Sequence, residues 1–79
     1  MTMTNKEMII SVLNDNGCQT GFQIKGSVYR KFGVSISPNA AAGVLRPLVA
    51  AGYAGKYPNP SNGKMAYWLT DLGKEKLIK

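Results

Sequence analysis

Histidine is absent from this chain of 79 residues, and acidic residues are scarce. Without histidine, the commonest general base and metal ligand is missing. The four carboxylates are scattered near the two ends in no paired arrangement: Glu7, Asp15, Asp71 and Glu75. A cysteine cluster, a Gly-rich phosphate loop and a nucleophile elbow are missing as well. The sequence therefore predicts that the protein is not an enzyme and uses neither a metal nor a cofactor.

Cysteine occurs once, and long apolar runs are missing. A single cysteine cannot form an internal disulfide, so we expect Cys18 to fill a small apolar space near a strand. The apolar runs fall far short of the ~20 residues of a membrane helix, and the N-terminus shows no secretory pattern. We therefore expect a cytoplasmic protein without membrane contact. The length and the 44% hydrophobic content predict a single globular domain over residues 1–79.

Positive charge is in excess, and it is concentrated in the centre of the chain. The formal net charge is +6, and no acidic residue occurs between Gly17 and Thr70. That stretch carries six cationic residues: Lys25, Arg30, Lys31, Arg46, Lys56 and Lys64. An uninterrupted positive region favours a polyanionic partner such as DNA or RNA, although many small soluble domains are mildly basic.

The first half of the chain contains signals for two helices. Thr4 with Glu7 and Thr20 with Gln23 each have the spacing of a capping box, which starts a helix. Asn16–Gly17 and Gly33 supply the stops. Between the helices, residues 18–20 are expected to be extended. In the second helix an apolar residue recurs every four positions, at Ile24, Val28 and Phe32, and Gln23, Ser27 and Arg30 are expected on or near the opposite side.

The second half predicts a third helix, a hairpin and a short last helix. Ser37–Pro38 is a favourable helix start, while Pro47 predicts a kink or a break. Residues 53–57 and 65–70 are rich in aromatic residues and read as two strands joined by a turn-forming segment. Tyr67 and Leu69 are expected to face the core. Thr70–Asp71 then starts the last helix.

This order resembles a winged helix-turn-helix domain over nearly the whole chain. The resemblance rests on the helix and turn at residues 22–33, on the Leu-Arg-Pro-Leu segment that leads to Gly52–Tyr53, and on the wing exit from Tyr67 to Leu77. It implies an α+β, mostly helical fold with a three-helix core, a β-hairpin wing and a short C-terminal helix. It also implies a small transcriptional regulator that binds duplex DNA sequence-specifically, with the third helix in the major groove.

Candidate contacts follow from the outward face of the third helix and from the basic residues. Asn39 and Arg46 are the side chains on that helix that can make two-pronged contacts with bases. The remaining outward positions are small, at Ala40, Ala42, Gly43 and Ala50. The candidate phosphate and wing contacts are Lys25, Arg30, Lys31, Lys56, Asn62 and Lys64.

Few side chains on the outward face of the third helix can contact bases, so a second interpretation stays open. The domain could be a winged-helix adaptor that binds another protein through the third helix or through Trp68. Trp68 is otherwise expected to pack beneath a neighbouring helix. The terminal apolar residues Leu72, Leu77 and Ile78 either complete the core or form a homodimer contact, because regulators of this kind commonly pair on palindromic sites.

Overall fold

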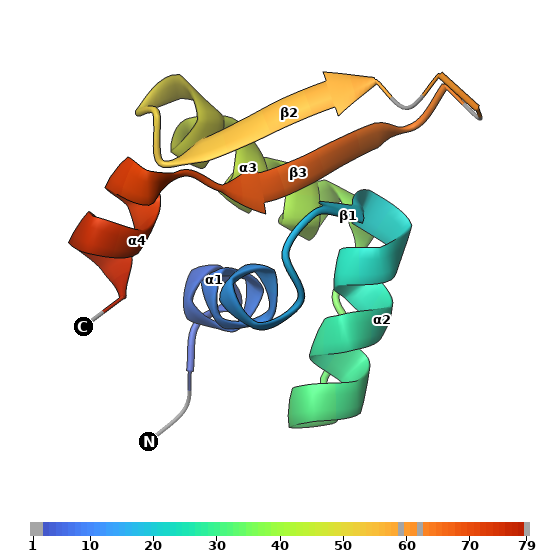
Figure 1. Ribbon diagram of the computed structural model, residues 1–79. Helices are drawn as coiled ribbons and strands as arrows, with labels where there is room; N and C mark the ends of the chain where they lie inside the picture. Colours follow the sequence, from blue (N-terminus) through green and yellow to red (C-terminus); the bar gives the residue numbers. More distant parts are fainter. Residues whose placement is uncertain (1–2, 59, 62, 79) are drawn as a thin grey trace.

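The computed structural model describes residues 3–58, 60–61 and 63–78. Within them, four helices and three strands follow one another in the expected order. Their bounds are α1 Asn5–Asn16, β1 Gln19–Thr20, α2 Gly21–Phe32, α3 Pro38–Ala50, β2 Ala54–Pro58, β3 Met65–Leu69 and α4 Asp71–Leu77. Figure 1 shows β2 and β3 side by side across the top, with α1 below them, α2 and α4 at opposite ends, and α3 behind.

Both predicted capping boxes are confirmed. The Thr4 hydroxyl accepts the Glu7 amide at 3.1 Å, and the Glu7 carboxylate accepts the Thr4 amide at 3.0 Å. The hydrogen bond from the Thr4 backbone also lowers the pKa of Glu7. Thr20 and Gln23 make the same reciprocal pair at the start of α2. Because local side chains satisfy the exposed amides at each helix start, the two helix starts are defined by the sequence itself.

The third helix runs without a break through Pro47. It begins with Ser37 as N-cap and Pro38 in its first turn, as predicted, and continues to Ala50. The break considered at Pro47 is therefore wrong. Proline removes the hydrogen bond to the carbonyl of Gly43, but Gly43 is exposed, so water can take that place. The buried residues Ala41, Leu45 and Leu48 hold the helix on the core.

The three strands form an antiparallel sheet in the order β1-β3-β2. Leu69 of β3 is buried and Tyr67 packs against the core, as the sequence predicted. Lys56 of β2 lies opposite Tyr67, and Gly55 lies opposite Trp68. This register therefore places Lys56 and Tyr67 on the sheet face opposite to Trp68, because neighbouring residues of a strand point to opposite faces.

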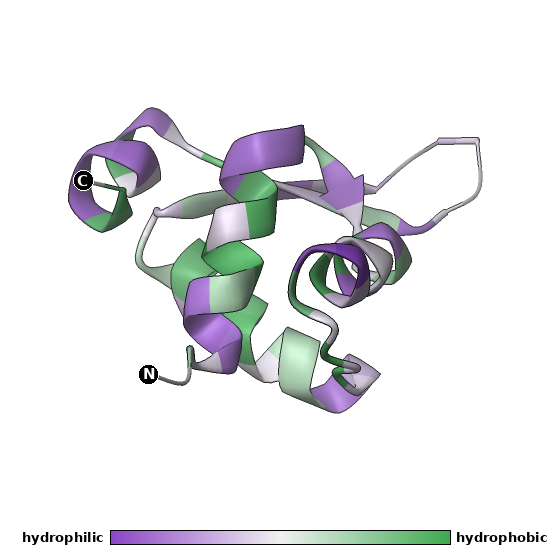
Figure 2. Cartoon of the chain, turned by 90° about the horizontal axis from the view of Figure 1, so that it is seen from below, coloured by the Kyte–Doolittle hydropathy of each residue, from purple (hydrophilic) through white to green (hydrophobic). Residues whose placement is uncertain are grey.

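The centre of the core is made by α1 and α2. Ile9, Val12 and Leu13 of α1 meet Ile24 and Val28 of α2, and all five are at most 1% exposed. Figure 2 shows α1 lengthwise, with hydrophobic residues in its middle and hydrophilic residues at its two ends. The terminal residues Leu77 and Ile78 also pack against this core, whereas Leu72 is 42% exposed.

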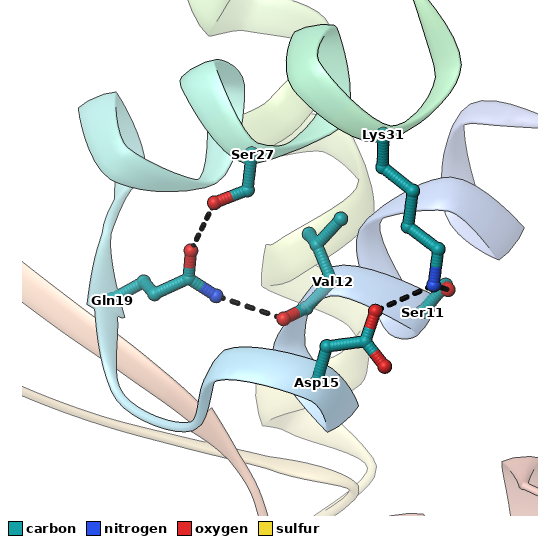
Figure 3. A network of polar contacts seen from close by, with 6 residues as sticks. All are labelled: Ser11, Val12, Asp15, Gln19, Ser27 and Lys31. Atoms are coloured by element: carbon teal, nitrogen blue, oxygen red, sulfur yellow. Dashed lines mark hydrogen bonds and ion pairs between the residues drawn. The ribbon is translucent and has the colours of Figure 1, made fainter.

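Polar contacts join α1, β1 and α2 beside this core (Figure 3). The Gln19 amide donates to the carbonyl of Val12 at 3.0 Å and accepts the Ser27 hydroxyl at 2.6 Å. The Ser27 side chain is only 5% exposed. The prediction that Ser27 lies on the outer side of α2 is therefore wrong. A hydroxyl on the inner face is stable here because it has a buried partner.

Two other expectations about single side chains are also wrong. Trp68 does not pack beneath a helix; its half-buried indole lies across Gly55 of the neighbouring strand, with its ring centroid 5.5 Å from that of Tyr57. Glycine at position 55 leaves the space that the indole occupies. Cys18 is exposed and is no apolar filler. Its sulfur instead makes a hydrogen bond that raises the pKa of the Tyr57 phenol.

Candidate nucleic-acid interface

The outward face of α3 presents the residues that the sequence assigned to it. Asn39, Gly43, Arg46 and Ala50 are exposed, while the opposite side of the helix is buried. Asn39 and Arg46 are seven positions apart, so they lie on one side of the helix, roughly 10 Å apart along its axis. Between them the surface is formed by small side chains. A flat partner surface can therefore approach the helix backbone closely there.

A groove of about 330 Å³ separates α3 from the hairpin. Arg46 lines it from α3 and Lys56 lines it from β2, and Ala42, Ala50 and Tyr67 line it as well. Both cations are exposed, and neither forms an ion pair with a described acidic residue. The groove therefore carries one positive charge from α3 and one from β2 along a lining of small and aromatic side chains, an arrangement that suits a strand of phosphates.

Lys25 extends this positive surface toward the start of α2. It lines a second hollow together with Phe22, and this hollow shares Ala42, Leu45 and Tyr67 with the groove. The two are therefore continuous along α3. Lys64, just before β3, reaches the same place, because its ammonium group lies 5.9 Å from the centre of the Phe22 ring. A cation over an aromatic face is attracted by the ring's quadrupole, which ties this part of the hairpin to α2.

Arg30 and Lys31 lie elsewhere. Both line a hollow between α1 and α2 that shares no residue with the α3 groove. The Lys31 ammonium donates to Ser11 at 2.7 Å and pairs with Asp15 at 2.5 Å. The Arg30 guanidinium donates to Ser27 at 3.3 Å. The structure thus groups Lys25, Arg46, Lys56 and Lys64 around the groove and separates these two residues from them.

One predicted site residue lies outside the described part of the chain, namely Asn62. Sequence reasoning also missed two features of the interface. Arg46 and Lys56 line the same groove because of the way α3 packs under the sheet. The sequence carries no direct signal for that packing. Phe22 is 78% exposed although it is a large apolar residue. Phe22 lies on α2 away from the apolar face of Ile24 and Val28, and this position in the sequence indicates its exposure.

None of the helices in the described part of the chain has the length and apolar content that crossing a bilayer requires.

Comparison with known proteins gives structural matches without sequence matches. No family model and no curated protein sequence matches the chain. Among solved structures, the winged-helix DNA-binding protein F93 from STIV superposes with a TM-score of 0.80, at 19% identity over 95% of this chain and 82% of that one. A transcriptional regulator from Clostridium thermocellum gives 0.78, at 18% identity over 94% and 80%. A cysteine mutant of MarR from E. coli in complex with operator DNA gives 0.75, at 19% identity over 94% and 49%.

These likenesses extend over almost the whole chain, which in turn spans most of F93 but about half of MarR. The elements, their order and the superpositions agree with the architecture expected from the sequence. The chain therefore has the winged helix-turn-helix fold, with α2 and α3 as the helix-turn-helix and β2–β3 as the wing.

Proposed function

We propose that this domain binds duplex DNA sequence-specifically as a small transcriptional regulator, with α3 in the major groove and the wing against the backbone. The observation that carries the proposal is the groove between α3 and the hairpin, lined by Arg46 from α3 and Lys56 from β2. The structural neighbours support it, since F93 is described as DNA-binding and MarR was solved on operator DNA.

The dimensions of α3 suit a major groove. The helix has 13 residues and is therefore roughly 20 Å long. Its outward side is made of small residues apart from Asn39 and Arg46, so it fits a groove about 12 Å wide. Arg46 would bond guanine and Asn39 would bond adenine, each in a two-pronged contact. Their spacing of roughly 10 Å along the helix axis lets the two side chains reach different base pairs.

The groove beside α3 gives the DNA backbone a place. A strand that leaves the major groove next to α3 would pass between the helix and the wing. There it would meet Lys56 on β2 and Lys25 on α2, with Lys64 close to the start of α2. These contacts would fix position without reading sequence, whereas Asn39 and Arg46 would supply specificity. Asn62 remains a proposed wing contact.

The test is a comparison of cognate and random DNA with a single variant. A cognate site is first selected from random duplexes with the full chain. Arg46→Ala should lower affinity for that site by about 1–3 kcal/mol more than affinity for random duplex. Fold stability should hardly change, because Arg46 is exposed. Arg30→Ala serves as the matched control, since Arg30 lies away from the groove.

Two outcomes would count against the proposal. Equal losses on cognate and random DNA in Arg46→Ala would remove the base-reading role of that residue. Absence of binding to any duplex at low salt would favour the protein-adaptor interpretation. In that case a charge at Ala42 or Ala50 should disrupt a protein complex instead.

A homodimer and the lack of an enzymatic role are part of the same proposal. Leu72 on α4 is an exposed apolar residue next to the end of the sheet, and it is available for a contact between two copies. Two copies would present two α3 helices to a palindromic site. Sedimentation of the full chain with and without its selected site should show two chains per duplex; one chain per duplex would remove the dimer.

A further inference from the structure

The exposed side of α2 carries two large aromatic side chains that the DNA-binding proposal does not use together. Phe22 is 78% and Tyr29 is 61% exposed. With Gly26 they follow the i, i+4, i+7 spacing of one helix face, opposite the buried residues Ile24 and Val28. We call Phe22, Gly26 and Tyr29 the α2 stripe. Exposed aromatic residues that gather on one face are typical of protein-recognition surfaces.

The α2 stripe is hollowed between its two rings. Phe22, Gly26 and Tyr29 line a depression of about 220 Å³ together with Lys25 and Ser35. Glycine at position 26 keeps its floor low, because a side chain there would fill the space between the rings. No residue of α3 lines this depression. It adjoins the hollow that continues the α3 groove, because Phe22 and Lys25 line both, and it can hold one apolar side chain of a partner.

Positive charge borders the α2 stripe on both sides. Lys25 lies along one edge, and the Arg30 guanidinium lies along the other, close to Gly26. The helix has no acidic residue in its sequence. In the described part of the chain the ion pair is that of Lys31 with Asp15, so neither Lys25 nor Arg30 has an acidic partner there. An incoming segment would therefore gain from negative charge on both sides of its apolar side chain.

We propose that the α2 stripe is a docking site for an acidic protein segment that inserts one large apolar side chain between Phe22 and Tyr29. Lys25 and Arg30 would pair with carboxylates on either side of that side chain. A nucleic-acid backbone would use Lys25 and Arg30 but would leave the depression empty. The two aromatic rings, the depression at Gly26 and the flanking cations together thus favour a peptide over a strand of phosphates.

A displayed library of random 12-residue peptides is the probe. Selection on the full chain, after depletion on the Phe22→Ala/Tyr29→Ala double variant, should enrich acidic peptides with a central aromatic or large aliphatic residue. The double variant should fold normally, because both side chains are exposed. It should bind an enriched peptide at least about tenfold more weakly than the unaltered chain, as loss of two interface aromatics predicts. Met3→Ala, which removes an exposed apolar residue near the start of α1, should bind it as the unaltered chain does.

Charge is tested by a matched pair of double variants. Lys25→Glu/Arg30→Glu should abolish peptide binding, whereas Lys74→Glu/Lys76→Glu makes the same change of net charge on α4 and should retain it. Enrichment of peptides without acidic residues, or of peptides that bind the aromatic double variant equally well, would overturn the proposal, as would no enrichment. If no peptide is enriched and Phe22→Ala/Tyr29→Ala loses DNA affinity, the α2 stripe belongs to the DNA interface instead.

Discussion

At the scale of single residues, Gly73 fixes the position of the last helix. A Cβ atom at this position would collide with the carbonyl group of Tyr53. That carbonyl also accepts the Thr70 amide at 3.1 Å, and the Thr70 hydroxyl donates to the carbonyl of Gly52 at 2.7 Å. The collision is with backbone that is held in place, so it cannot be relieved by turning a flexible side chain. The glycine is needed for close approach and not for its φ angle.

We therefore predict that Gly73→Ala lowers the free energy of unfolding by about 1–3 kcal/mol through overpacking. Gly43→Ala is the matched control, because both glycines lie in helices but a Cβ at position 43 meets nothing within 4 Å. Because alanine has a higher helix propensity than glycine, Gly43→Ala should instead raise the free energy of unfolding by roughly 0.5–1 kcal/mol. Urea denaturation of both variants measures the difference, and equal midpoints would contradict the packing argument.

Ser27 offers a second test at this scale. Its hydroxyl is the donor to the buried Gln19 carboxamide oxygen. Ser27→Ala leaves that oxygen without a donor, so we predict a loss of about 1–3 kcal/mol in the free energy of unfolding. Ser35→Ala, at an exposed position, should stay within about 0.5 kcal/mol of the unaltered protein. A Ser27→Ala protein as stable as Ser35→Ala would show that another group takes over the oxygen.

At the scale of elements, the packing of α2 divides the basic residues into two groups. Lys31 is held by Asp15 and Ser11 of α1, whereas Lys56 lines the groove that α3 forms with β2. A cation already paired with a carboxylate releases fewer counterions when DNA binds. The two lysines therefore differ in their expected contribution to binding, although both are exposed and carry the same charge.

We predict that Lys56→Gln reduces the salt slope of DNA binding by about 1, while Lys31→Gln changes it much less. Affinity is measured by fluorescence anisotropy between about 50 and 200 mM salt, a range over which phosphate contacts change affinity strongly. Lys31→Gln should also cost less than about 1 kcal/mol of stability, as for an exposed ion pair. If the two variants lower the slope equally, the DNA footprint includes the α1–α2 side of the molecule.

At the scale of the whole molecule, the distribution of charge predicts how strongly salt affects binding. Four basic residues gather around the groove: Lys25, Arg46, Lys56 and Lys64. If all four contact phosphates, the logarithm of affinity should fall with the logarithm of salt concentration with a slope of about −3.6. Titrations at several salt concentrations measure it. A slope near zero would exclude an electrostatic complex with DNA.

Much of the architecture was open to prediction from the sequence, because it depends on local chemistry. Thr4 and Thr20 begin their helices with partners three residues away, and Gly17 and Gly33 end them with positive φ angles. The alternation of Tyr67 and Leu69 defined the inner face of β3. Such features do not depend on the rest of the fold, and for this reason the sequence alone predicts the winged-helix order.

Only the tertiary structure decided the contacts between residues that are distant in the chain. The sequence gives no rule by which Ser27 meets Gln19, Lys31 meets Asp15, or the Trp68 indole lies on Gly55. The same holds for the groove that Arg46 and Lys56 both line. These contacts depend on how the helices and the sheet pack, and that packing is settled by the shape of the whole core. The sequence by itself therefore determined the elements and the excess of positive charge, and the packing determined which charges gather at one surface.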